Sequence, residues 1–302
     1  MVGRQRGVDR QSSRIHHAVV ADAVGVVGTV VDTIRRRGFE STPAATSAEV
    51  RVSVSLPDWV RWQTAPNPGP MTLEGTNTWI LGTEELLVID PGPLDESHLL
   101  DIALHGTVAH IVLTHGHTDH SAGVQRLHEL TGAPVSAWDP AFVHGGEALR
   151  HAMTLEVGQV RAVVHHTPGH SADSVSLVAS LSGPDDVVVL TGDTVLGRGT
   201  AVIADPDGDL GDYLNSLEVL LGLVDAPVLP GHGPVGGRLR QRVQEYQRHR
   251  QERLEQVRHA VAQGARTVEE VVAAVYTEVA DDLREAAHMS ARAHLRHLGV
   301  PH

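Results

Sequence analysis

Residues 114–120 read THGHTDH and directly follow the apolar stretch HIVL at 110–113. Because a strand end holds the following loop rigidly at the edge of a sheet, side chains of that loop can converge on one point. His115 and His117 are two residues apart and can bind one metal ion, while Asp119 and His120 can turn toward a second. The stretch therefore predicts a metal site at the end of a strand.

Three further candidate ligands follow in the chain, each after a segment that is predicted to be a strand. They are His170 in HTPGHS, Asp193 in VVVLTGDT and His232 in PVLPGHGP. Five imidazoles and two carboxylates fit two Zn²⁺ ions, with Asp193 bridging them and a shared hydroxide as the nucleophile. The chain has 21 histidines, most of them without such a context. The order of the four segments therefore carries the prediction, rather than the histidine content.

From residue 51 onward, apolar or alternating segments predict strands, and segments with helical periodicity lie between them. Strands are expected at 51–56, 77–81, 86–90 and 109–115, near residues 134, 160, 174 and 187, and at 226–232. Helices are expected at about 94–104, after Asp119 and at about 212–223, the last with a buried stripe of Tyr213, Leu214, Leu217, Val219 and Leu220. Strands that first meander and then alternate with helices predict a mixed α/β fold.

Changes in composition divide the chain into three parts. Residues 1–50 are predicted to be a poorly ordered extension, 51–234 an α/β domain that carries the metal site, and 235–302 a helical domain. Within the last part, helices are expected at 236–262, 267–277 and 281–298. No stretch is apolar for long enough to predict a transmembrane helix.

The composition narrows the classes of partner. A formal charge of -13, from 24 basic and 37 acidic residues, argues against a general affinity for duplex DNA or for anionic membranes. Because the chain has no cysteine, it has neither disulfides nor thiolate metal ligands, and a cytoplasmic protein is expected by default.

Longer motifs around the candidate ligands resemble a known family. They are NPGPMTLEGTNTWILG at 67–82, TGDTVLGRGT at 191–200, DYLNSLEVLL at 212–221 and LPGHGPV at 229–235. Residues 64–236 resemble the metallo-β-lactamase superfamily, and more narrowly the β-lactamase-like protein 2 endoribonucleases and their bacterial relatives. The resemblance implies an αβ/βα sandwich followed by a winged-helix-like cap, although the pattern of the last 68 residues lacks the usual wing strands.

The resemblance also implies a role for each candidate residue. One zinc ion would be held by His115, His117 and His170, the other by Asp119, His120 and His232, with Asp193 between them. Asp90, in VIDPGP, matches the first motif of the family. Its implied role is to orient a metal ligand rather than to bind metal itself.

The same centre serves several chemistries, so two hydrolytic activities stay open. The first is cleavage of single-stranded RNA, and the second is hydrolysis of a small ester, thioester or lactone, as in glyoxalase-II-like enzymes. An iron dioxygenase and a metal-binding module without activity are further alternatives. True β-lactamase activity is disfavoured, because such enzymes generally lack an equivalent of Asp193 and many use a cysteine ligand.

The RNA hypothesis depends on arginines in the expected helix at 236–262, which are Arg238, Arg240, Arg242, Arg248, Arg250, Arg253 and Arg258. A basic strip on an acidic protein could guide a phosphate backbone. The same strip could instead be a solvated helix face with pairs four residues apart, such as Arg248 with Glu252. Few aromatic side chains are available for base stacking, because only 3% of the residues are Phe, Trp or Tyr.

The seven candidate ligands predict about two metal ions per chain. Elemental analysis of the protein after loading with excess zinc should give a ratio near that value. A ratio that stays at one would contradict the dinuclear site. Iron as the dominant metal after expression without added zinc would favour the dioxygenase alternative.

Overall fold

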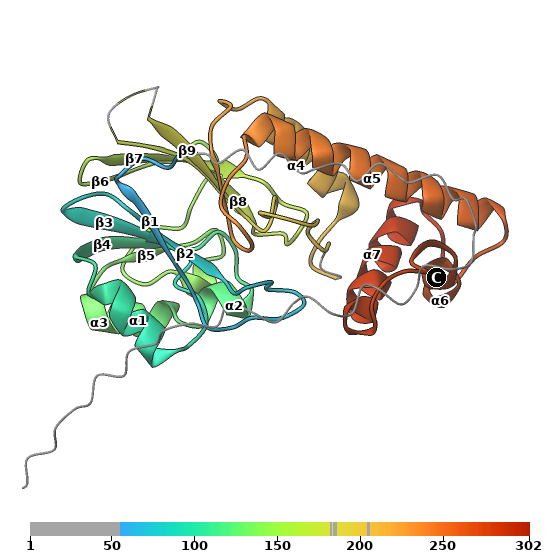
Figure 1. Cartoon of the computed structure of the whole chain (residues 1–302), viewed down its shortest axis with the longest axis horizontal. Helices are drawn as coiled ribbons and strands as arrows, with labels where there is room; N and C mark the ends of the chain where they lie inside the picture. Colours follow the sequence, from blue (N-terminus) through green and yellow to red (C-terminus); the bar gives the residue numbers. More distant parts are fainter. Residues whose placement is uncertain (1–54, 182, 184–185, 204–205) are drawn as a thin grey trace, which may run out of the picture. The chain divides into compact units, whose positions relative to one another are not determined.

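The computed structural model describes residues 55–181, 183, 186–203 and 206–302. The expected extension at 1–50 lies outside the described residues. Two five-stranded sheets form the centre of the described chain (Figure 1). The first has the order β1 (Val60–Thr64), β2 (Asn77–Leu81), β3 (Glu85–Ile89), β4 (Thr107–Val112) and β5 (Val135–Ser136). The second has the order β10 (Val228–Pro230), β9 (Val187–Gly192), β8 (Val175–Ser180), β7 (Val160–His166) and β6 (Thr154–Val157).

The facing sides of the two sheets share one hydrophobic core. Leu87 and Ile89 of β3 contribute from the first sheet, and Val164, Leu177 and Leu190 contribute from the second, all fully buried. All five residues of β2 and the last four of β3 are buried, because both faces of these inner strands are covered. This double burial explains why NTWIL and ELLVI form strands although they do not alternate between apolar and polar residues.

Helices cover the outer faces of both sheets and complete the αβ/βα sandwich that the sequence predicts (Figure 1). α1 (Glu96–Ala103) and α3 (Val124–Thr131) pack on the first sheet. The short α2 (Thr118–Ser121), which precedes α3, carries two of the candidate ligands, Asp119 and His120. On the second sheet lies α4 (Leu210–Leu221), whose residues share a core with Val189 of β9 and Val228 of β10.

The C-terminal part consists of α5 (Leu239–Ala262), α6 (Val268–Val275), the 3₁₀ helix Asp281–Leu283 and α7 (Arg284–His297). Val243 and Tyr246 of α5 belong to the same buried cluster as Leu217 of α4. The second half of α5 packs against α6 and α7 through a separate cluster. Among the described residues after β10, every regular element is helical. The domain boundary at residue 234 stays a prediction.

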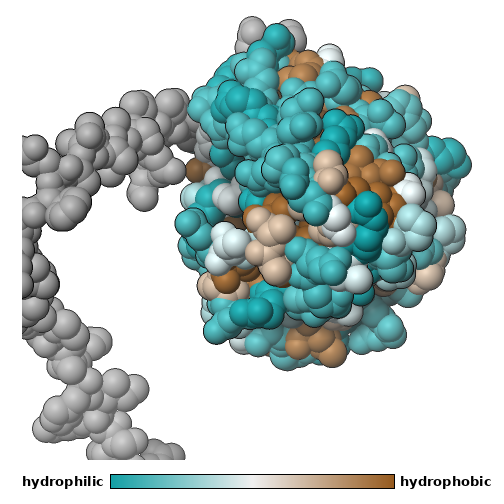
Figure 2. Space-filling view, turned by 90° about the vertical axis from the view of Figure 1, so that its right-hand side faces the viewer, coloured by the Kyte–Doolittle hydropathy of each residue, from teal (hydrophilic) through white to brown (hydrophobic). Residues whose placement is uncertain are grey.

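The side of the molecule that carries α6 and α7 is mainly hydrophilic, with a few apolar patches (Figure 2). No described helix is both long and apolar enough to cross a membrane.

The structure differs from the sequence analysis in several elements. Residues 51–54 of the strand expected at 51–56 lie outside the described residues, while residues 55 and 56 are not in a strand, and the sequence analysis did not predict β1 at 60–64. The sequence analysis also missed β6, whose four residues are too few for periodicity to stand out. On α4, Val219 is 38% exposed, so it does not belong to the buried stripe. Two residues along a helix from Leu217, its side chain points to nearly the opposite face.

The two faces of α4 predict opposite results for two similar truncations. Leu217→Ala should lower the free energy of unfolding by about 2–5 kcal/mol, because it leaves a cavity between α4 and α5. Val219→Ala should change it by less than about 0.5 kcal/mol, as expected for a surface position. Urea denaturation followed by circular dichroism would measure both values. Equal losses in the two variants would contradict the packing of α4.

Candidate metal centre

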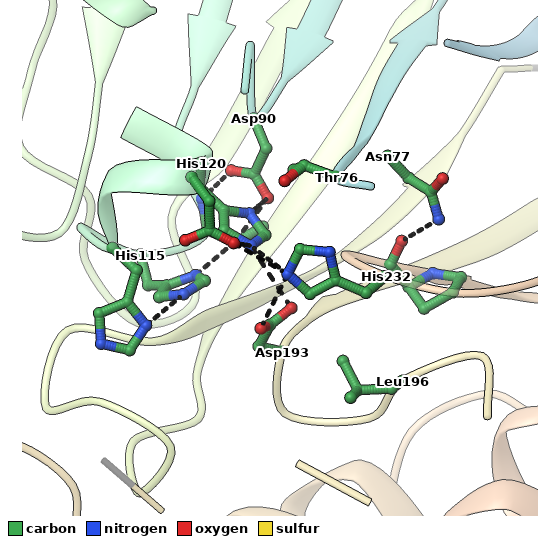
Figure 3. A network of polar contacts seen from close by, with 12 residues as sticks. Thr76, Asn77, Asp90, His115, His120, Asp193, Leu196 and His232 are labelled. Carbon is green, nitrogen blue, oxygen red and sulfur yellow. Dashed lines mark hydrogen bonds and ion pairs between the residues drawn. The ribbon is translucent and has the colours of Figure 1, made fainter. Parts of the chain in front are cut away.

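The candidate ligands lie at carboxyl ends of strands, where loops of both sheets meet (Figure 3). Asp90 follows β3, and the stretch at 114–120 follows β4, which runs parallel to β3. Asp193 follows β9 and His232 follows β10, again a parallel pair. His170 lies in the loop between β7 and β8. Because parallel neighbours end at the same edge, residues 142 positions apart in the sequence meet at one site.

The first group of side chains consists of three imidazoles. The Nδ1 atom of His117 lies 3.0 Å from Nε2 of His115 and 2.9 Å from Nε2 of His170. These three nitrogens lie within 4.8 Å of one another and could hold a metal ion. The group is the one that the family resemblance implies for the first metal.

The second group consists of Asp119, His120 and His232. Nε2 of His232 lies 3.2 Å from Nε2 of His120 and 3.0 Å from Oδ2 of Asp119. Asp193 lies between the two groups, because its Oδ2 is 3.3 Å from Nε2 of His232 and 3.8 Å from Nε2 of His170. This is the position expected of a bridging carboxylate.

Neighbouring groups determine which nitrogen of each buried imidazole faces the centre. A backbone carbonyl can only accept a hydrogen bond, so the Nδ1 atom that contacts it must carry the proton. Nδ1 of His170 lies 2.6 Å from the Val202 carbonyl, and Nδ1 of His232 lies 3.1 Å from the Gly75 carbonyl. The Nε2 atom of each ring therefore points into the centre, where it is the atom that can bind a metal ion.

Asp90 orients two further ligands, in the role that its sequence motif implies. Its Oδ2 lies 2.9 Å from Nδ1 of His120 and accepts a hydrogen bond of 2.7 Å from Oγ1 of Thr114. Since Thr114 donates its proton to Asp90, its oxygen is left to accept from Nδ1 of His115, 3.1 Å away. The backbone of Asp90 has φ +53°, a left-handed conformation that Asp and Asn tolerate better than most residues.

The donor set fits a pair of metal cations. Two ligand atoms of a tetrahedral zinc ion with bonds of about 2.0–2.1 Å lie roughly 3.3 Å apart. The nitrogen–nitrogen and nitrogen–oxygen distances above, 2.9–3.8 Å, lie around this value. Moreover, Oδ1 of Asp193 is buried without a hydrogen-bond partner, which a bound cation would supply. Metal binding by these residues stays a prediction, as do the identity and the number of the ions.

Burial and the charges of neighbouring side chains shift the pKa values of the residues at the centre. Burial would raise the pKa of Asp193, but the charges of His232 and His120 outweigh it and hold this pKa well below its usual range. Burial would lower the pKa of His232, yet the charge of Asp193 and a hydrogen bond that His232 donates to Asp119 raise it to about 9. Burial lowers the pKa of His170 to about 4. The carboxylates are therefore ionised, and His170 is a neutral imidazole with a free lone pair at neutral pH.

Gly231 is a requirement of the site that the sequence analysis did not single out. A Cβ atom at this position would lie 2.3 Å from Oδ1 of Asp193 and 2.8 Å from Cε1 of His120. The backbone before His232 therefore passes so close to the ligands that only glycine fits. The motif PGHGP carried the signal, since two glycines flank the histidine.

Support for the centre also comes from Tyr213 of α4 and Arg250 of α5. The Tyr213 hydroxyl donates to the carbonyl of Thr194, next to Asp193, over 2.5 Å. The guanidinium of Arg250 lies 4.8 Å from the centre of the Tyr213 ring and donates to the carbonyl of Ala201. Ala201 precedes Val202, whose carbonyl fixes His170.

Most of the seven arginines at 238–258 that the RNA hypothesis uses are buried or have protein partners, whereas Arg240 and Arg248 are exposed. Arg250 is only 3% exposed. Arg238 pairs with Asp225, Arg242 pairs with Glu245, and Arg253 donates to the carbonyl of Val275. The ion pairs within α5 join residues three apart, 242 with 245 and 255 with 258. The expected pair of Arg248 with Glu252 is not among them.

A cleft of about 460 Å³ adjoins the centre on the side of His117. Its walls include the rings of Trp138 and Phe142 and three carboxylates, those of Asp139, Asp173 and Asp207. Trp138 stacks on His166 with ring centres 3.7 Å apart, which holds the wall in place. No arginine or lysine is among the described residues that line the cleft.

Comparison with known proteins assigns the family. Residues 71–232 match the model of the metallo-β-lactamase superfamily. The chain belongs to this superfamily. Its members support the assignment of a metal-dependent hydrolase, and residues 267–299 match a winged-helix domain associated with β-lactamases. The C-terminal helices of this metallo-β-lactamase family protein therefore include a domain that is known to occur together with the fold.

Individual relatives cover most of the chain. It is 34% identical over 247 residues to an atrochrysone carboxyl ACP thioesterase from Aspergillus fumigatus, which spans 72% of this chain and 74% of the relative. It is 31% identical over 261 residues to a β-lactamase-like protein 2 homolog from Drosophila melanogaster, covering 77% and 85%. Among solved structures, a β-lactamase domain protein from Burkholderia ambifaria aligns with a TM-score of 0.69 at 22% identity, covering 82% and 87%.

The contacts of Asp90 predict a loss of metal affinity when its charge is removed. Asp90→Asn keeps the size of the side chain and tolerates the positive φ, but an amide cannot stabilise the Thr114 and His120 contacts as a carboxylate does. Metal affinity should fall about 10- to 100-fold. Competition with a chelator would measure it, and far-ultraviolet circular dichroism would check the fold. Unchanged affinity in a folded variant would show that Asp90 does not orient the ligands.

Proposed function

We propose that this protein is a dinuclear zinc hydrolase that cleaves the ester or thioester bond of an acyl substrate which is neutral around the scissile bond. The observation that carries the proposal is the cleft at His117. Its aromatic rings can hold an apolar acyl group, whereas Asp139, Asp173 and Asp207 disfavour a chain of phosphates. Metal ions at the centre would attract anions there, but they would leave the acidic wall of the cleft in place.

The relatives add support for acyl chemistry. The protein from Aspergillus fumigatus that is 34% identical is named a thioesterase, and the match covers 72% of this chain. A thioester is attacked at a carbonyl carbon, a step that suits a centre which binds the developing oxyanion. A location in the cytoplasm stays part of the proposal.

When bound, two zinc ions would lower the pKa of a water molecule toward neutrality and polarise the carbonyl oxygen of the substrate. The residues of the chain would position both reactants. Asp193 would set the separation of the two ligand groups, and the hydrogen bonds of His120, His170 and His232 would keep their rings from rotating. Preorganisation of this kind avoids rearrangement during the reaction.

Asp119 is the candidate acceptor for the proton of the attacking water. Its side chain is 27% exposed, against 10% for Asp193. Burial would raise the pKa of Asp119, but its hydrogen bond with His232 and the charge of His120 lower it. The carboxylate is therefore ionised at neutral pH and can act as a general base.

Cleavage of single-stranded RNA gains less support. Arg238 and Arg242 are in ion pairs with Asp225 and Glu245, Arg253 does not line the cleft, and the cleft offers no cation among its described residues. These ion pairs contribute little to stability, but they occupy the donor groups of the arginines. An RNA substrate would therefore have to displace the two carboxylates.

A substrate panel tests the proposal. The zinc-loaded protein should hydrolyse a short neutral acyl thioester with saturation kinetics and leave a single-stranded RNA oligonucleotide intact. Asp193→Ala, as the matched inactive control, should lower kcat/KM more than about tenfold while the fold persists. An anionic succinyl thioester should be a poorer substrate than the acetyl one, and Asp207→Asn should narrow that difference.

RNA cleavage that declines steeply with salt would replace the proposal. In that case a variant with Arg238, Arg242 and Arg253 all changed to Gln should flatten the salt dependence by up to about three units. Absence of turnover on every substrate, with two metal ions bound, would favour a binding module.

A further inference from the structure

A second pocket, of about 200 Å³, lies between residues 200–202 and the C-terminal helices. It is lined by none of the residues of the cleft at His117. One part of its wall is apolar and includes Val279, Leu283 and Ala287. The other part carries Arg250, Arg253 and His249 of α5, together with polar side chains of Thr200, Tyr276 and Ser290. The described lining contains no carboxylate.

Arg250 is the unusual member of this wall. Its side chain is buried and contacts the carbonyl of Ala201 and the ring of Tyr213. Within the described part of the chain it has no carboxylate partner, and its Nε has no hydrogen-bond partner. A buried guanidinium without a counter-charge is costly, so such a charge is normally paired. Arg250 is therefore a buried positive charge that no described carboxylate of the chain neutralises.

Arg253 adds a second positive charge to the same wall, and His249 adds an imidazole nitrogen. The guanidinium of Arg253 lies 4.6 Å from the centre of the Tyr276 ring, and Nε2 of His249 lies 3.4 Å from Oγ1 of Thr200. Burial lowers the pKa of His249, and the charges of Arg250 and Arg253 lower it further. This local excess of positive charge contrasts with the charge of -13 for the whole chain.

We propose that this pocket binds a small organic phosphate, with the phosphate group at Arg250 and Arg253 and an apolar body against the opposite wall. A dianionic phosphate would balance the two guanidinium groups, which donate in a planar fork suited to phosphate oxygens. The volume accommodates a phosphate with a body of a few carbon atoms. The proposal does not depend on the chemistry assigned to the metal centre.

The pocket shares a wall with that centre. Arg250 contacts the carbonyl of Ala201, and the next carbonyl, that of Val202, holds the Nδ1 proton of His170. A ligand that orders residues 200–202 would therefore also order a metal ligand. The site joins the C-terminal helices to the catalytic part of the molecule.

The site can be tested by isothermal titration calorimetry. The metal-loaded full chain is titrated with phenylphosphonate and, separately, with inorganic phosphate. Phenylphosphonate resists hydrolysis and carries both the anion and an apolar ring. It should bind in a saturable manner and more tightly than inorganic phosphate, because only the former fills the apolar side. Arg253→Gln and His249→Gln should each weaken its binding, the arginine change by about tenfold. Arg248→Gln is the matched control, since Arg248 is an exposed arginine of the same helix and does not line the pocket.

Phosphonates can also bind to metal ions, so the variants decide where the probe lies. If Arg253→Gln and Arg250→Lys both fold, as judged by circular dichroism, and bind phenylphosphonate as the parent does, the anion lies at the metal centre and the proposal is wrong. Lack of saturable binding to the parent would also overturn it. Inorganic phosphate that binds as tightly as phenylphosphonate would exclude the apolar subsite.

Discussion

Asp193, enclosed by the imidazoles of His120, His170 and His232, is the constraint on which the rest of the site depends. A buried carboxylate is stable only where positive charge or hydrogen-bond donors surround it. Here those groups come from three separate segments, so each must arrive at the same point with little freedom. Placing them at the ends of strands in two packed sheets achieves this, because strands are the least mobile part of the fold.

A layer of supporting contacts then determines how the ligands are presented. Asp90 with Thr114, the carbonyl of Val202 and the carbonyl of Gly75 each engage the nitrogen that faces away from the centre. These contacts fix both the tautomer and the orientation of the rings, which affinity and reactivity of a metal site require. Part of this support originates outside the sandwich, since Arg250 of α5 holds the residue before Val202.

Specificity resides in a different part of the structure from reactivity. A centre of this kind can hydrolyse several kinds of bond, so its ligands say little about the substrate. The cleft beside it is more informative, because Trp138, Phe142 and three aspartates define both its shape and its charge. The pocket at Arg250 has the opposite charge, and the protein therefore separates an acidic surface near the centre from a basic one beneath the C-terminal helices.

The sequence alone determined the family, the order of the strands that carry the site and all seven candidate ligands, because short motifs at strand ends are local patterns. It also indicated the role of Asp90 through its motif. The tertiary structure determined those features that depend on residues distant in the sequence, which no local sequence pattern contains. Whether Val219 or Leu210 faces the core, and whether Arg250 meets water or Tyr213, depends on which elements pack together. The requirement for glycine at position 231 likewise comes from Asp193 and His120, which are distant in sequence and close only in the folded chain.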